Sequence, residues 1–148
     1  MILSGQAHTV APGEGRVVEL GIARMRVLAA GEATRRAFTL AEFTGGAGPW
    51  TVPHLHQAME ESFFVLDGTF TFTVGEQEIE SGPGSYVLVP RGARHLVTAN
   101  EADSRCLVLM VPGGQEEMFY ELGELGSDAL RDPSVRAAIS ARYDSVPV

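Results

Sequence analysis

The stretch that decides the fold runs from Gly48 to Gly68 and reads GPWTVPHLHQAMEESFFVLDG. Within it, His54 and His56 stand two positions apart, and Glu61 follows five positions later. Alternate side chains of an extended strand share one face, so both imidazoles can point to the same place. Imidazole and carboxylate groups together suit first-row divalent metals, from iron through nickel to zinc. The stretch therefore predicts a metal site.

An ordinary surface role is the competing interpretation, because an isolated His-x-His pair is more often solvated than metallated. The distribution of histidine favours the metal. Of the four histidines in the chain, His54, His56 and His95 fall in two segments that glycines and prolines frame. His8 lies in a polar N-terminal stretch and is interpreted as exposed. We therefore expect His95 to join the site from a separate strand.

Two spaced patterns resemble the motifs of the cupin superfamily. The first stretch is similar to the motif G(x)5HxH(x)3-4E(x)6G, and GSYVLVPRGARHLVTAN is similar to the second motif, G(x)5PxGxxH(x)3N. The matching positions are Gly48, His54, His56, Glu61, Gly68, Gly84, Pro90, Gly92 and His95. One position departs, because Ala99 stands where the motif has asparagine and Asn100 follows one residue late. That asparagine is not a ligand in the family, so the departure concerns the strand end.

The resemblance implies an all-β fold, a small antiparallel jelly-roll β-barrel with short C-terminal helices. It also implies one divalent metal ion per chain, with the ligands His54, His56, Glu61 and His95. Iron, nickel, cobalt, manganese, copper and zinc all suit these ligands. Strand parity favours Glu61 over Glu60, because Glu61 shares a face with Phe63 if the strand is regular.

Strand and turn signals favour the same architecture. The stretch TFTFTVGEQEIESGPG alternates polar and apolar residues and predicts a hairpin that turns at Gly75 and Glu76. Helical spacing predicts a helix over 115–122 closed by Gly123, and Asp132 with Pro133 predicts the start of a second helix that runs to about Arg142. We expect one domain over residues 1–148, with a barrel core at about 16–112 and a helical tail at about 115–143.

Composition narrows the function. The net charge of −8 argues against a nucleic-acid or anionic-membrane partner, because a polyanion would be repelled. All eleven basic residues are arginine, which excludes a Schiff-base lysine and a phosphate-loop lysine. Cys106 is the one cysteine and lies in an apolar run, typical of a buried inert thiol. No signal sequence or membrane-spanning stretch is recognisable, so we expect a cytoplasmic protein.

The predicted pocket is apolar and aromatic and is assigned to Trp50, Val52, Phe63, Val65, Phe72, Tyr86 and Val97, although Phe72 could equally be plain core. Such a lining favours a flat or aromatic organic substrate. The chain is similar to the single-domain bacterial quercetin 2,3-dioxygenases of the cupin superfamily. This resemblance implies a homodimeric metal-dependent oxygenase that uses O2, with Glu61 as the catalytic base. The alternatives are a metal-dependent isomerase, cyclase or decarboxylase, a non-catalytic small-molecule-binding module, and a storage-type or purely structural cupin. The last is disfavoured because such members of the family commonly lose the histidines that this chain retains.

Overall fold

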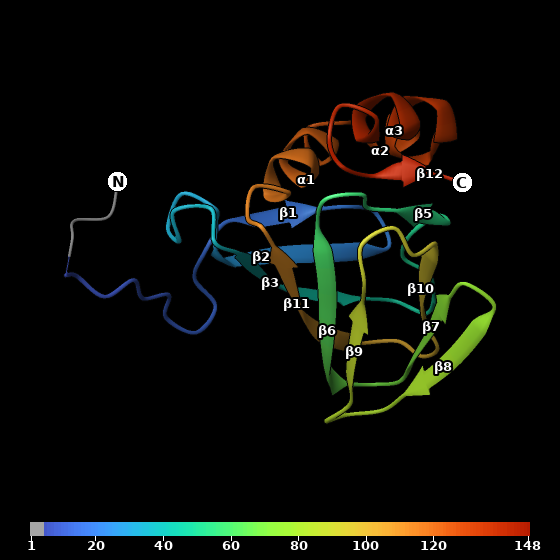
Figure 1. Cartoon of the computed structure of the whole chain (residues 1–148), viewed down its shortest axis with the longest axis horizontal. Helices are drawn as coiled ribbons and strands as arrows, with labels where there is room; N and C mark the ends of the chain where they lie inside the picture. The colour runs from blue at the N-terminus through green and yellow to red at the C-terminus, as the bar shows by residue number, and fades with distance from the viewer. Residues whose placement is uncertain (1–4) are drawn as a thin grey trace.

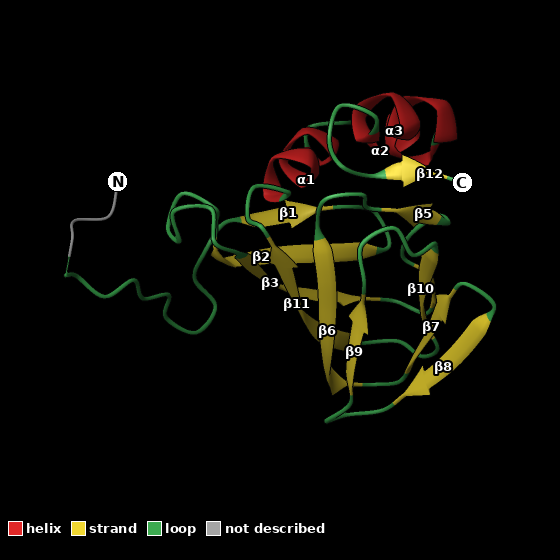
Figure 2. Cartoon of the chain, in the orientation of Figure 1, coloured by secondary structure: helices red, strands yellow, loops and turns green. Residues whose placement is uncertain are grey.

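The protein is a small barrel with a helical cap. The computed structural model describes residues 5–148, so the first four residues of the predicted domain lie outside the described part. Two antiparallel sheets enclose the core (Figure 2). The helices gather at one end of the barrel, beside the C-terminus (Figure 1). The predicted all-β jelly-roll barrel with short C-terminal helices is confirmed.

The larger sheet has six strands in the order β1-β2-β3-β11-β6-β9. Their bounds are Val17–Glu19 (β1), Ala23–Ala29 (β2), Thr39–Gly45 (β3), Ser104–Val111 (β11), Glu60–Asp67 (β6) and Tyr86–Val89 (β9). Every second residue of β11 is buried, as the alternation of a strand between core and solvent requires. The inward rows of this sheet form one wall of the core.

The second sheet carries two of the four candidate ligands, His54 and His95. Its order is β12-β5-β10-β7-β8, and β4 pairs with β10 beside this path. The bounds are Val146–Pro147 (β12), His54–Leu55 (β5), His95–Ala99 (β10), Phe70–Val74 (β7), Gln77–Ser81 (β8) and Gly48–Pro49 (β4). The predicted hairpin is confirmed, because Gly75 and Glu76 join β7 to β8.

Strand β5 is short, as expected next to Pro53, which cannot donate a ladder hydrogen bond. On one side it pairs with β10, which sets His54 opposite His95. On the other side it pairs with β12, which sets Leu55 opposite Val146. Two neighbouring strands therefore hold this short segment in place.

The helices are α1 (Glu116–Gly123), α2 (Ser127–Arg131) and α3 (Pro133–Ser140). Asp132 caps α3 as predicted, accepting a hydrogen bond from the Ser134 amide at 2.9 Å. Gly123 is not the cap of α1 but its last residue, and it lies so close to β1 that an added Cβ would meet Val18 Cγ1 at 2.3 Å. Sequence spacing revealed neither α2 nor β12. Within residues 5–148 the structure contains no helix of the length and hydropathy needed to cross a membrane.

Candidate metal centre

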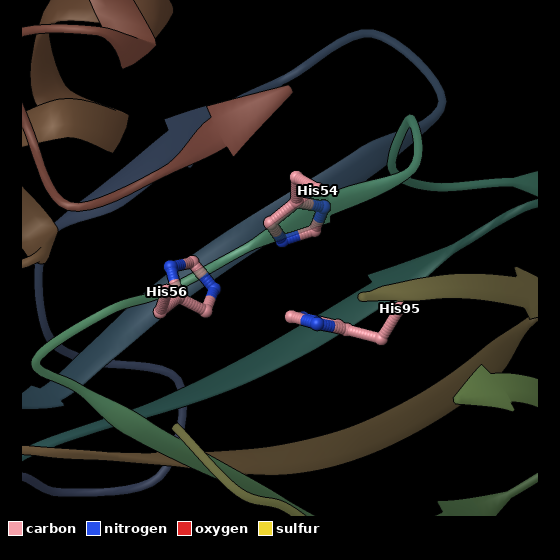
Figure 3. Close-up of side chains that lie close together, drawn as sticks. All are labelled: His54, His56 and His95. Carbon is pink, nitrogen blue, oxygen red and sulfur yellow. The ribbon is translucent and has the colours of Figure 1, made fainter. Parts of the chain in front are cut away.

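Three histidines from two segments of the chain converge inside the barrel. His54 lies on β5, His56 follows directly after it, and His95 begins β10. Figure 3 shows the three imidazoles grouped around one point. One ring nitrogen from each lies within 4.8 Å of the other two, and all three side chains are buried. Neutral imidazoles at these separations can bind one metal ion.

Hydrogen bonds to the backbone decide which ring nitrogen faces this point. Each Nδ1 contacts a backbone carbonyl oxygen. His54 contacts that of Val52 at 2.7 Å, His56 that of Asp144, and His95 that of Ala93 at 3.0 Å. A carbonyl oxygen only accepts, so each Nδ1 carries the proton and each Nε2 keeps its lone pair. The Nε2 atoms of His56 and His95 are buried without a hydrogen-bond partner. A metal ion would satisfy both nitrogens, and the fixed tautomer is the one that metal binding needs.

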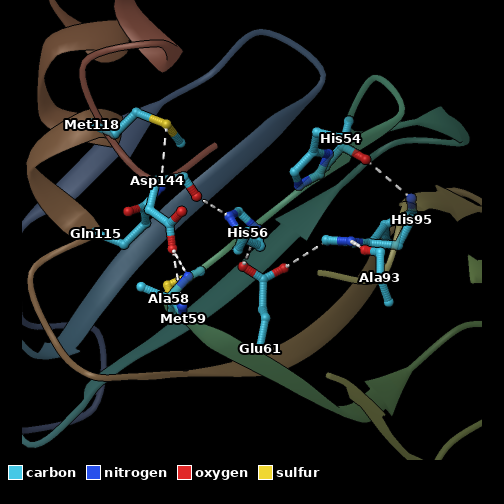
Figure 4. Close-up of polar contacts among 12 residues, drawn as sticks. His54, His56, Ala58, Met59, Glu61, Ala93, His95, Gln115, Met118 and Asp144 are labelled. Atoms are coloured by element: carbon cyan, nitrogen blue, oxygen red, sulfur yellow. Dashed lines mark hydrogen bonds and ion pairs between the residues drawn. The ribbon is translucent and has the colours of Figure 1, made fainter. Parts of the chain in front are cut away.

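The Glu61 carboxylate completes the ring of donors (Figure 4). It is 7% exposed on β6, and its oxygens lie 3.5 Å from Nε2 of His56 and 3.8 Å from Nε2 of His95. These gaps are too long for good hydrogen bonds. They suit donors that share an ion at about 2.1 Å each, since two such donors at a tetrahedral angle lie about 3.5 Å apart. Glu60 points away from the histidines and pairs with Arg91 at 2.7 Å.

Burial and neighbouring charges set the ionisation of the centre. Burial, reinforced by His95, lowers the pKa of His54 to about 4, so this imidazole is neutral at neutral pH. Burial also opposes charge on His56, but the Glu61 carboxylate outweighs it and raises the pKa of His56. For Glu61, burial favours the neutral acid, yet His56 and His95 hold the pKa well below its usual range. The ionised Glu61 gives the centre a negative charge to set against a cation.

A cavity of about 520 Å³ opens beside His54, His56 and Glu61. Its size is that of a small-molecule site. Four of the predicted pocket residues line it, namely Trp50, Val52, Phe63 and Val97. An apolar wall next to a polar donor set can hold an organic molecule with one oxygen directed at the donors.

Three predicted pocket residues lie elsewhere. Tyr86 is 60% exposed on the outer face of β9, because the alternate positions of that strand point into the core. Val65 and Phe72 are fully buried in the core rather than on the cavity wall. Phe72 packs against Phe63, with ring centroids 4.9 Å apart, and so supports a cavity residue from behind.

The C-terminal third supplies a wall of the cavity that sequence reasoning missed. The lining residues from this region include Gln115, Met118, Phe119, Leu122, Arg131, Arg136, Ser145, Pro147 and Val148. The helical spacing of Met118, Phe119 and Leu122 predicted a buried face of α1, but no sequence signal distinguishes a cavity wall from ordinary core. Cys106 also lines the cavity, and burial raises the pKa of its thiol to about 12, in agreement with the predicted inert cysteine.

Comparison with known proteins agrees with this geometry. Residues 40–112 match the family model of the Cupin domain. Quercetin 2,3-dioxygenase of Bacillus subtilis (strain 168) is 29% identical over 117 residues, which cover 79% of this chain and 35% of that protein. Quercetin 2,3-dioxygenase of Aspergillus japonicus is 29% identical over 141 residues, which cover 89% of this chain and 40% of that protein. The chain thus spans less than half the length of these relatives.

Solved structures share the fold. The structure of KdgF from Halomonas sp. aligns with a TM-score of 0.68 at 17% identity. The alignment covers 76% of this chain and 99% of that one. Likeness at this identity concerns the fold alone. The family match and the spacing of both motifs show that residues 40–112 form a cupin domain, and the chain resembles the quercetin 2,3-dioxygenases.

Proposed function

We propose that this chain is a metal-dependent cupin oxygenase that acts on a small aromatic or enolisable organic substrate. One divalent ion per chain would be held by His54, His56, His95 and Glu61. The observation that carries the proposal is the convergence of three buried imidazoles of fixed tautomer on one point beside an apolar cavity. The names of the two relatives make flavonols the first substrates to test.

A redox-capable divalent ion, when bound, supplies a Lewis acid for a substrate oxygen and a means of reaction with O2. Four apolar side chains of the cavity wall would pack against a flat ring, namely Trp50, Phe63, Val52 and Val97. Glu61 is assigned as the base that takes a proton from a substrate hydroxyl. A carboxylate is a weaker base than an enolate or a phenolate. Acidic enol and phenol hydroxyls therefore suit it better than a C–H bond.

Elemental analysis of the purified protein tests the metal assignment. We expect about one divalent metal per wild-type chain, and loss of that metal when His54 and His56 are both replaced by alanine. His8→Ala is the matched control, since His8 hydrogen-bonds to the Leu28 carbonyl at 2.7 Å and lies outside the cavity wall. Undiminished metal in the double variant would refute the assignment of these ligands.

Oxygen uptake tests the reaction. Metal-free protein is reloaded with one ion at a time, and O2 consumption is followed with quercetin and with simpler enols. We expect uptake in the wild type and its loss in Glu61→Gln, which keeps the size of the side chain but not its basicity. Retention of metal by the inactive variant would separate proton transfer from metal binding, whereas full activity would remove Glu61 from the role of base.

A second candidate uses the same centre without oxygen. The juxtaposition of Glu61 with His56 and His95 is also a proton-transfer site, which favours an isomerase, cyclase or decarboxylase as the alternative. Product formation under strict anaerobiosis would favour this class over the oxygenase. Binding of ligands with no turnover under any metal would instead identify a non-catalytic binding module.

A further inference from the structure

Two arginines on the cavity wall lack an acidic partner. Arg131 ends α2 and Arg136 lies within α3, and both line the cavity. Two nearby acids are engaged elsewhere, since Asp132 caps α3 and Glu121 pairs with Arg142 at 2.5 Å. A third acid, Asp128 in the first turn of α2, forms no ion pair with Arg131 in the described part of the chain. Among residues 5–148, no ion pair or side-chain hydrogen bond joins either arginine to an acid. Both guanidinium groups are therefore available to a ligand.

The charge of this wall is opposite to that of the whole chain. The chain carries a net charge of −8, yet within the described part of the cavity wall Glu61 is the one acidic residue beside these two arginines. Arg131 is exposed and Arg136 is half-buried, and the apolar side chains beside them exclude part of the water that would otherwise screen an anion. The planar guanidinium fork also matches the geometry of a carboxylate.

We propose that the substrate is an amphipathic anion, with an apolar ring against Trp50 and Phe63 and a carboxylate or similar oxyanion on Arg131 and Arg136. This inference rests on the proposed function only in taking the cavity as the substrate site. It adds the charge of the ligand, which neither the metal ligands nor the apolar lining specify.

Two fluorescent probes that share one ring system test the proposal without metal or turnover. The probes are 8-anilinonaphthalene-1-sulfonate, an anion, and N-phenyl-1-naphthylamine, its neutral counterpart. Energy transfer from Trp50 restricts the signal to probe near the cavity, because Trp50 is the one tryptophan of the chain and lines the cavity. The double variant Arg131→Gln/Arg136→Gln is compared with Arg94→Gln, which removes an exposed arginine of the β9–β10 turn.

We expect the double variant to bind the anionic probe about ten-fold more weakly and the neutral probe within about two-fold of wild type, as loss of charge-assisted contacts predicts. Arg94→Gln should change neither affinity. Equal effects on both probes, or unchanged binding of the anion, would overturn the proposal. Either result is independent of metal content and oxygen uptake, so it leaves the proposed function to its own tests.

A different observation concerns the C-terminal segment that follows α3. The Asp144 carboxylate accepts hydrogen bonds from the backbone amides of Gln57 (2.8 Å), Ala58 (2.8 Å) and Met59 (2.9 Å). Its backbone carbonyl accepts the hydrogen bond from Nδ1 of His56 (Figure 4). One residue thus fastens both the His56 ring and the loop that leads from His56 to Glu61. This residue lies beyond residues 40–112, the part that matches the Cupin domain.

The geometry points to Asp144 as a positioning residue for His56 and Glu61, so that the C-terminal segment forms part of the metal centre. The inference rests on the proposed metal site. Strand β12 strengthens the attachment, because Val146 pairs with Leu55 and the Val148 amide donates to the Pro53 carbonyl at 3.2 Å. Without the carboxylate, the amides of residues 57–59 lose their acceptor and the segment loses its main anchor.

Titration with Co²⁺, followed by its visible absorption, tests this role. We expect Asp144→Ala to weaken Co²⁺ binding about 10- to 100-fold and to alter the absorption bands, as loss of outer-shell support does. Asp144→Asn keeps an amide oxygen and should recover part of the affinity. Asp132→Ala is the control, because it removes a cap at α3 that makes no contact with His56. Wild-type affinity and spectrum in both Asp144 variants would overturn the inference, whereas absence of Co²⁺ binding in the wild type would instead refute the metal site itself.

Discussion

Acid should destabilise the metal-free protein through His54, and replacement of His54 by glutamine should remove this effect. Burial, reinforced by His95, lowers the pKa of His54 from 6.5 to about 4. The unfolded chain therefore binds a proton on this imidazole at a higher pH than the folded chain does. Stability from the neutral, buried ring is fully present above about pH 6.5 and is lost as the pH falls toward about 4.

The magnitude follows from the size of the shift. One pKa unit corresponds to about 1.4 kcal/mol, so the lowering from 6.5 to about 4 contributes on the order of 3 kcal/mol to the free energy of unfolding at neutral pH. At about pH 4.5 most of this contribution is gone, because the unfolded imidazole is almost fully protonated there. A glutamine of similar length can still donate to the Val52 carbonyl, which His54 contacts at 2.7 Å, but it does not titrate.

Urea unfolding in the presence of a chelator measures the effect at neutral pH and at about pH 4.5. Other groups titrate in both proteins, so the relevant quantity is the difference in the free energy of unfolding between wild type and His54→Gln. On acidification from neutral pH to about pH 4.5, we expect the wild type to lose roughly 2–3 kcal/mol more free energy of unfolding than His54→Gln loses. His8→Gln, far from the cavity, controls for the loss of a histidine. A difference that does not depend on pH would refute the view that folding holds His54 neutral in a desolvated site.

Three further predictions concern the scaffold. Gly68→Ala should lower the free energy of unfolding, measured in urea, by about 1–3 kcal/mol, because φ is +75° and the new Cβ would lie 2.3 Å from Ser104 Oγ. Gly84→Ala is the control and should cost less, because Gly84 has a φ of +89° but open space around it. Glu116→Gln should lower the free energy of unfolding by about 1–3 kcal/mol in the same assay. The buried carboxylate accepts hydrogen bonds from the Gly31 amide (3.2 Å), the Gly114 amide (3.0 Å) and the Thr39 hydroxyl. An unchanged urea midpoint would contradict this prediction. Tyr86 is 60% exposed and lies opposite Phe64 of β6 on the outer face of the sheet. If the chain is the expected homodimer and this apolar face is its interface, Tyr86→Glu should halve the mass measured by light scattering. An unchanged dimer mass would exclude this face as the interface.

The grouping of the candidate ligands could be predicted because most of its signal is local. Two histidines two residues apart share a face of any extended strand, and the glycine and proline spacing of both motifs marks where strands turn. Parity likewise distinguished Glu61 from Glu60. Parity alone did not decide which residues line the cavity. It identifies the face of the sheet to which a side chain belongs, but not whether that side chain lies at the cavity or deeper in the core. Val65 and Phe72 share the inward face, yet they lie in the core rather than at the cavity.

The sequence by itself determined the strand periodicity, the turns and the identity of the candidate metal ligands, since each depends on residues a few positions apart. Tertiary structure alone decided which elements close the cavity and what holds His56. The partner of that histidine is a backbone carbonyl 88 positions away, and a carbonyl is common to every residue type and leaves no trace in the sequence. The approach of Arg131 and Arg136 to the cavity has the same origin, because it depends on the packing of α3 against α2 and β12, which the local sequence does not specify.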